Sequence, residues 1–174
     1  MMREAVAHLR NEEYILIDAG AKTFLLGDIR IQSCYENARE KLGELIVHQE
    51  VLVPDVGWIQ DYVTKMPDLA WDIIDFSEKP LSICLPGGRH VAEGLLENDG
   101  GLFVRVCKEK AIHKLIYNFG RGVFCLHLKA SAKDVGVLTL DKKVLHLQAS
   151  EIGFEPNPKR MSLGLEGEVK FWDA

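Results

Sequence analysis

Apolar residues along the chain alternate between short continuous runs, typical of buried strands, and positions three or four apart, typical of helices. The runs predict strands at residues 14–17, 24–26, 45–53, 81–85, 102–106, 123–128, 135–140, 143–147 and 168–172. The spacings predict helices at residues 2–9, 33–42, 56–63, 68–76, 91–96 and 108–119. Strands alternate with helices, but strand pairs stand near both ends of the chain. The pattern therefore predicts an α+β fold of the α/β type, with helices flanking a twisted open mixed sheet.

Length and composition fit one folded domain. The chain has 174 residues, of which 47% are apolar and 27% charged, as in an ordinary soluble globular protein. No linker, internal repeat or low-complexity tract divides it. We therefore expect a single domain over residues 1–174, with a less regular tail from about residue 150.

The charge of the chain limits its partners. A formal net charge of -5 disfavours general attraction to nucleic acid, but it does not exclude a local basic patch. No apolar run approaches the ~20 residues that a membrane span needs. The N-terminal residues are too polar for a secretory signal. We therefore expect a cytoplasmic protein with no membrane partner.

Four cysteines are spread along the chain, and none forms a C-x-x-C pair. Three of them lie in or beside predicted strands that are rich in aliphatic residues. Free cysteine behaves as a small hydrophobic residue, so the pattern predicts buried, reduced thiols. These residues are Cys34, Cys84, Cys107 and Cys125.

The sequence has no Walker A loop, no G-x-G-x-x-G, no H-E-x-x-H and no G-x-S-x-G motif. Cys125 and His127 are two apart in one predicted strand, so their side chains share a face. Zinc needs three or four ligands, and no other residue has a compatible spacing in the sequence, so we expect no metal site. A cysteine–histidine nucleophilic pair has equally little support, because this strand reads as buried. The catalytic residues, if any, stay unknown.

Arg105 is out of place in the apolar pattern. It stands between Val104 and Val106 in a short predicted strand and shares a strand face with Phe103. If both faces of the sheet are covered, its guanidinium needs an ion-pair partner or a bound anion. The alternative is an arginine of an edge strand that lies along the surface. Arg105 is the first pointer to a site.

Further basic and hydroxyl residues stand at the ends or edges of predicted strands, where open sheets bind ligands. Lysine and arginine hold phosphate, and hydroxyl groups orient it, so the set predicts a site for a phosphate-bearing ligand. The alternative for each residue is a solvated surface side chain, or a polar hairpin turn at residues 18–23. The candidate ligand-binding residues are Lys22, Thr23, Lys79, Arg105, Arg121, Ser131 and Lys133.

Several segments resemble, in the same order, motifs of the YrdC-like family. Residues 79–86 are similar to its Pro-Leu-Thr-x-x-Leu strand, and residues 101–106 to its Val-x-Val-Arg-x-Pro strand. Ser131-Ala132 resembles the start of its Ser-Ala-Asn loop, and residues 23–28 resemble its Thr-x-Thr-x-Tyr-Gly-Leu segment. The resemblance covers roughly residues 3–140.

The resemblance implies a twisted open sheet with a concave, positively charged face. Members of the family bind nucleotides, and binding of double-stranded RNA or tRNA is ascribed to the fold. The enzymes among them form threonylcarbamoyl-adenylate from threonine, bicarbonate and ATP with Mg²⁺, for tRNA modification in translation. By position, the resemblance puts Thr23 in the threonine pocket, Arg105 near the triphosphate and Ser131 in the nucleotide loop.

The chain also departs from the family pattern. Residues 18–23 replace the family's Pro-Thr-Asp-Thr, only Lys41 matches a Lys-x-Arg motif, and Lys133 replaces the asparagine of Ser-Ala-Asn. Adenylate formation needs cations that stabilise charge on the phosphates. The departures indicate a divergent member that kept the scaffold and lost or changed the reaction.

Three functions follow from this interpretation. The first is a protein that binds a nucleotide or structured RNA through Lys22, Arg105, Arg121 and Lys133. The second is a threonylcarbamoyl-adenylate synthase with a rearranged site, and only this function implies a cofactor, ATP with Mg²⁺. The third is a non-catalytic protein-interaction domain with a vestigial pocket. The sequence leaves the oligomeric state open.

Overall fold

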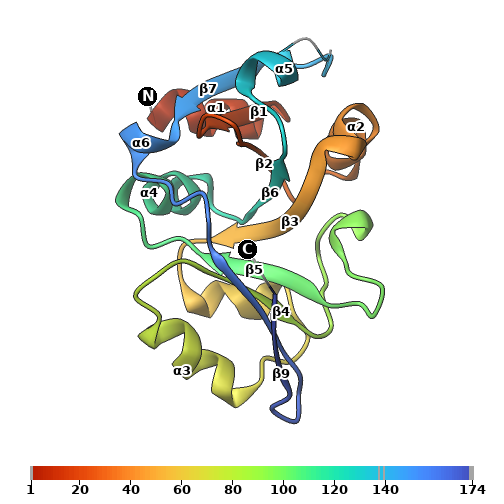
Figure 1. Cartoon of the computed structure of the whole chain (residues 1–174), viewed down its shortest axis with the longest axis vertical. Coiled ribbons are helices and arrows are strands. Elements are labelled where there is room, and N and C mark those ends of the chain that lie inside the picture. Colours follow the sequence, from red (N-terminus) through yellow and green to blue (C-terminus); the bar gives the residue numbers. More distant parts are fainter. Residues whose placement is uncertain (1, 137, 139, 173–174) are drawn as a thin grey trace.

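The structure is a computed structural model that describes residues 2–136, 138 and 140–172. In these residues nine strands form one mixed sheet in the order β7-β1-β2-β6-β3-β5-β4-β8-β9 (Figure 1). The predicted fold class, a mixed sheet with flanking helices, is confirmed. The strands are β1 (Tyr14–Asp18), β2 (Thr23–Asp28), β3 (Ile46–Val53), β4 (Leu81–Leu85), β5 (Leu102–Val106), β6 (Val123–Leu128), β7 (Val144–Gln148), β8 (Lys159–Leu163) and β9 (Val169–Trp172).

The helices pack on both faces of this sheet. Within the described residues, every one of them is too short or too polar to span a lipid bilayer. They are α1 (Met2–Arg10), α2 (Gln32–Leu42), α3 (Asp68–Phe76), α4 (Lys110–Phe119), α5 (Ala132–Gly136) and α6 (Ala149–Ile152), with 3-10 turns η1 (Gly43–Leu45), η2 (Val56–Asp61) and η3 (Glu93–Leu95).

Alternation along each strand gives the sheet two buried faces. Leu16, Val51 and Phe124 point to the first face, whose apolar core includes buried residues of α2, α3 and α5. Leu52 and Cys125 point to the second face, whose core includes buried residues of α1, α4 and α6. Because helices cover much of both faces, a charged side chain in a central strand requires a partner.

The segment at residues 153–158, which we call the strap, joins α6 to β8 across the second face (Figure 1). Phe154 is buried and packs edge-on against Phe24, with the ring centroids 5.0 Å apart. The carbonyl of Glu155 accepts a hydrogen bond from Arg105 in β5. The region predicted as a tail therefore crosses the sheet and then adds β8 and β9 to its far edge.

The helix predicted at residues 91–96 is wrong. This segment is a loop with one short 3-10 turn, and β4 and β5 on either side of it pair as antiparallel neighbours. Gly94 lies at the centre of the loop, where an added Cβ would be 2.5 Å from the Tyr35 ring. Packing of that ring against the glycine backbone, together with the low helix propensity of glycine, outweighs the apolar spacing.

The strand predicted at residues 135–140 is also wrong at its start, because Val135 and Gly136 lie in α5. The N–H of Asp134 donates a hydrogen bond to Ser131 Oγ at 3.2 Å, which favours a helical first turn. Positions 137 and 139 lie outside the described residues. The helix predicted at residues 56–63 is the 3-10 turn η2 instead.

All four cysteines are free and buried, as predicted. Burial raises the pKa of the Cys84 thiol to about 12, and it raises the pKa of the other three thiols as well. We expect a disulfide reagent such as DTNB to leave all four unmodified in the native protein at about pH 8, and to modify all four in denaturant. Rapid, stoichiometric reaction of any thiol in the native protein would contradict this burial.

Candidate functional site

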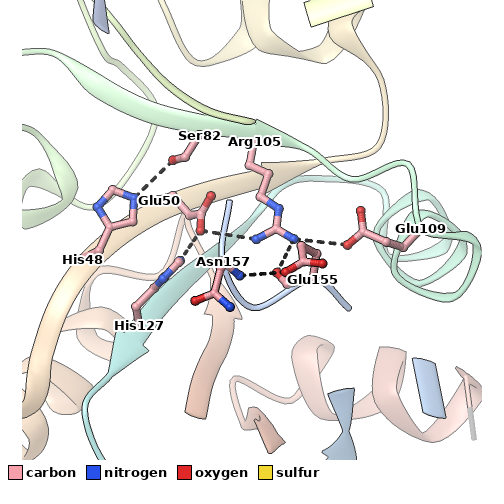
Figure 2. A network of polar contacts seen from close by, with 8 residues as sticks. All are labelled: His48, Glu50, Ser82, Arg105, Glu109, His127, Glu155 and Asn157. Atoms are coloured by element: carbon pink, nitrogen blue, oxygen red, sulfur yellow. Dashed lines mark hydrogen bonds and ion pairs between the residues drawn. The ribbon is translucent and has the colours of Figure 1, made fainter. Parts of the chain in front are cut away.

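A network of charged and polar side chains lies on the second face of the sheet, beside α4 (Figure 2). Arg105 is fully buried there, with its guanidinium 3.9 Å from Glu50 Oε2 and 3.2 Å from Glu109 Oε2. It also donates to the Glu155 carbonyl at 2.8 Å and lies 4.5 Å from the centroid of the Phe154 ring. A buried Arg105 requires an ion-pair partner or a bound anion. The protein itself supplies ion-pair partners, Glu50 and Glu109.

Burial and charge act in opposite directions on Arg105. Burial lowers its pKa, but the Glu50 carboxylate and further neighbours raise the pKa above its ordinary value, so the guanidinium stays charged. Its Nε and Nη1 groups have no hydrogen-bond partner among the described residues. The pairing with Glu50 is thus electrostatic rather than a full set of hydrogen bonds.

Glu50 stands at the centre of the network and is completely buried. Its Oε2 contacts His127 Nε2, while its Oε1 has no hydrogen-bond partner among the described residues. Burial raises the pKa of Glu50, but His127 and Arg105 outweigh burial and lower it to about 2. The carboxylate is therefore ionised at neutral pH.

His48 and Glu50 reach this face because they are two apart in β3. The pairing of β3 with β6 shifts register between Ile46 and His48, which marks a β-bulge. Bulges re-aim side chains, and here Val47 is 59% exposed at the edge of a pocket. Sequence reasoning missed these residues, although two polar residues at alternate positions of an apolar strand were the signal.

A pocket of about 310 Å³ opens beside the network. No carboxylate is among the described residues that line it. Lys22 and Lys129 meet there because Thr23, at the start of β2, pairs with Leu128, at the end of β6. Lys22 Nζ donates a hydrogen bond to Asn157 Oδ1 of the strap at 2.5 Å. The polar lining consists of Lys22, His48, His127, Lys129, Asn157 and Arg160.

Four of the seven candidate residues lie near this end of the sheet. Lys22 lines the pocket, and Thr23 is buried beside it with its hydroxyl donating to the Ala130 carbonyl at 3.2 Å. Ser131 accepts a hydrogen bond at the start of α5, and Lys133 is exposed on that helix. Of these four residues, Lys22 lines the pocket, and the other three lie near it without being part of its lining.

The other three candidates lie elsewhere. Arg105 is buried in the network, and Lys79 lines a different hollow, between α3 and β4. Arg121 donates from Nε and Nη2 to the Asp28 carboxylate, at 3.0 and 2.5 Å, beyond the start of β6. Asp28 is the last residue of β2, and Lys22 directly precedes the first. The Arg121–Asp28 pair and the pocket therefore lie at opposite ends of that strand. The structure does not bring the seven residues to one hollow.

Comparison by sequence finds no match, either to a protein-family model or to a curated protein. Comparison of structures does find similar folds. Sua5 from P. abyssi has a TM-score of 0.74 at 14% identity, over 94% of this chain and 50% of that chain. YciO from E. coli has a TM-score of 0.69 at 14% identity, over 94% of this chain and 84% of that chain.

Full-length HypF, solved in a phosphate- and nucleotide-bound form, has a TM-score of 0.72 at 11% identity, over 98% of this chain and 28% of that chain. The chain thus spans about half the length of Sua5 and less of HypF. These likenesses agree with the family resemblance found along the sequence. The chain has a divergent form of the YrdC-like fold.

Proposed function

We propose that this protein binds a nucleotide, through its phosphate groups, in the pocket beside the charged network. The observation that carries the proposal is the lining: three cationic side chains and two imidazoles, with no carboxylate among the described lining residues. The chain as a whole has a net charge of -5, so this hollow is opposite in sign to the average surface. Local positive charge in a hollow concentrates anionic ligands.

The lining offers both halves of a nucleotide site. Lys22 and Lys129 are exposed lysines, whose ammonium groups bind phosphate as charged donors. Val47, Pro156 and Pro158 provide apolar surface for a sugar or a base. The volume of about 310 Å³ lies within the range of small-molecule sites. A HypF structure with a similar fold was solved with phosphate and nucleotide, which supports this class of ligand.

Titration calorimetry with ATP, with and without Mg²⁺, tests the proposal. We expect Lys22→Ala and Lys129→Ala each to weaken binding by about tenfold or more, because each removes a charged hydrogen bond to phosphate. Lys65→Ala is the matched control, since Lys65 is an exposed lysine outside the pocket lining. No binding by the unmodified protein, or equal affinity of all three variants, would contradict the proposal.

A catalytic alternative, threonylcarbamoyl-adenylate synthesis, is favoured by the likeness to a Sua5 structure complexed with L-threonine. Burial of Arg105 argues against it, because the residue that the resemblance puts near the triphosphate is fully buried and ion-paired here. Release of pyrophosphate from ATP with threonine and bicarbonate would establish synthesis. Nucleotide binding without that release supports a binding protein.

Structured RNA or tRNA is the larger ligand that the same phosphate chemistry could hold. Binding through phosphates weakens with salt, and the slope of log affinity against log salt reports the number of phosphates neutralised. A measurable slope with duplex RNA that falls in Lys22→Ala would extend the proposal to RNA. A flat, weak response would restrict it to free nucleotides.

A further inference from the structure

We infer that His48, Glu50 and His127 form a binding site for a divalent transition-metal ion, with Zn²⁺ as the expected occupant. One ring nitrogen of each histidine and one carboxylate oxygen of Glu50 lie within 4.8 Å of one another. Zn²⁺ and its first-row neighbours bind imidazole and carboxylate, and a set of two histidines and one carboxylate leaves coordination positions open. This site stands on its own ligands and does not depend on the proposed nucleotide.

The three ligands are held by paired strands. His48 and His127 are direct cross-strand partners in β3 and β6, and Glu50 follows two positions after His48 on the same face. The two rings lie 4.8 Å apart at an interplanar angle of 82°. Figure 2 shows the Glu50 carboxylate between His48 and Arg105, with the His127 ring below it. Ligands on paired strands are positioned more firmly than ligands on loops.

A simple ion pair between His127 and Glu50 does not account for the whole cluster. That pair uses Oε2 of Glu50 and leaves Oε1, in a completely buried residue, with no hydrogen-bond partner among the described residues. Buried acceptors without a partner are uncommon and costly. A metal ion bound at this carboxylate would give the second oxygen a partner and would use the His48 ring as well.

The site has an entry path and an oriented ligand. His48 and His127 both line the pocket of about 310 Å³, so an ion can enter from it and its open coordination positions face it. Ser82 Oγ is 3.2 Å from His48 Nε2, which fixes the orientation of that ring. Hydrogen bonds to ligand side chains of this kind raise metal affinity.

Charge around the cluster permits a divalent cation. Arg105 and Arg160 oppose it, as do Lys22 and Lys129 of the pocket lining. Glu109 lies 3.2 Å from Arg105 and offsets its charge, which leaves the Glu50 carboxylate to attract a cation. Two carboxylates, Glu50 and Glu109, thus stand against the guanidiniums of Arg105 and Arg160.

A small movement is needed to bind the ion. Donors bound tetrahedrally to Zn²⁺ at about 2.1 Å lie about 3.4 Å apart, so ligand atoms up to 4.8 Å apart must close by up to roughly 1.4 Å, and the much shorter His127–Glu50 contact must open. His48 is only partly buried and lines the pocket, so its side chain can shift toward the ion. The required change is therefore a side-chain adjustment within an unchanged sheet.

The experiment is Zn²⁺ binding by the full chain without nucleotide, followed by calorimetry and by metal analysis after gel filtration. We expect one Zn²⁺ per chain, and a loss of affinity of at least about tenfold in His48→Ala and in His127→Ala. His146→Ala is the matched control, because His146 is an exposed histidine outside the cluster, and it should bind as the unmodified protein does. Circular dichroism shows whether each variant is folded.

Substitution with Co²⁺ identifies the ligands by spectroscopy. A site of nitrogen and oxygen ligands gives d–d bands without the near-ultraviolet thiolate-to-cobalt band that a cysteine ligand would add. If His127→Ala fails to fold, His48→Ala decides the question alone, because it removes a partly exposed ring. Less than one equivalent of Zn²⁺ bound by the unmodified protein, a thiolate band, or unchanged affinity in folded His48→Ala would overturn the inference. None of these outcomes alters the calorimetry with ATP, so the two proposals fail separately.

Discussion

Replacing Arg105 with methionine is expected to lower the free energy of unfolding by about 3–5 kcal/mol. Methionine keeps much of the length of the side chain but removes the charge that faces Glu50, which is completely buried. The ionised Glu50 carboxylate then loses its guanidinium neighbour, and breaking one side of a buried pair costs more than the pair contributes. The Glu155 carbonyl of the strap also loses its donor.

Urea unfolding followed by circular dichroism measures this loss. Arg3→Met is the control, because Arg3 is exposed on α1 and its replacement should change the free energy of unfolding by at most about 0.5 kcal/mol. A stability loss of the same small size in Arg105→Met would show that the buried pair has no structural role.

The double variant Glu50→Leu with Arg105→Leu separates the pair from its parts. Arg105 already has two groups, Nε and Nη1, without hydrogen-bond partners among the described residues. Replacing both members of a buried pair by apolar residues is often close to neutral. We therefore expect the double variant to be more stable than Arg105→Met. If the loss of unfolding free energy in the double variant equals the sum of the losses in the two single variants, the two residues act independently.

Replacing Phe124 with alanine is the second large change, and we expect it to lower the free energy of unfolding by about 3–5 kcal/mol. Phe124 is fully buried in β6 on the first face, where its ring packs edge-on against Tyr35 with centroids 5.8 Å apart. It also fills the space over Gly27, where an added Cβ would lie 2.3 Å from the ring. Truncation would leave a cavity between a helix and the centre of the sheet.

The same unfolding experiment measures this loss, with Phe76→Ala as the matched control. Phe76 is 81% exposed at the end of α3, so its truncation should cost at most about 0.5 kcal/mol. Equal losses in the two variants would contradict the packing described for the first face. Because β6 carries His127, the Phe124 variant should also weaken binding of Zn²⁺ if the strand shifts.

The proposed nucleotide pocket and the inferred metal site share His48 and His127. An ion bound there would present open coordination positions to the pocket. Phosphate oxygens are suitable ligands for those positions, in addition to their contacts with Lys22 and Lys129. ATP affinity measured with and without Zn²⁺ therefore reports whether the two sites act together.

Local pattern alone determined most of the elements. Strand β6 has the predicted bounds because a short apolar run between a glycine-rich turn and a polar loop has few other conformations. Helix α3 likewise follows from apolar spacing after a proline. Burial of the four cysteines followed from the apolar runs around them. Each of these depends on interactions between residues that are close in sequence.

Local pattern failed where a distant contact decided the conformation. The segment at residues 91–96 has helical spacing, but Tyr35 of α2 packs against Gly94 and holds the segment as a loop. Residues 135 and 136 look strand-like, but they continue a helix that begins beside Ser131. The predicted ligand site was wrong in part for the same reason. Arg121 was predicted to bind a ligand, but it forms an ion pair with Asp28.

The sequence by itself determined the two-faced sheet, its flanking helices and the need of Arg105 for a partner, because period and burial are properties of neighbouring residues. Only the tertiary structure decided which charges meet. Glu50 and His127 are 77 residues apart, and they come together because β3 pairs with β6 rather than with a strand near it in sequence. The order of strands in the sheet is set by packing of the whole chain. Which residues line the pocket, and which form the cluster of His48, Glu50 and His127, therefore depends on that packing.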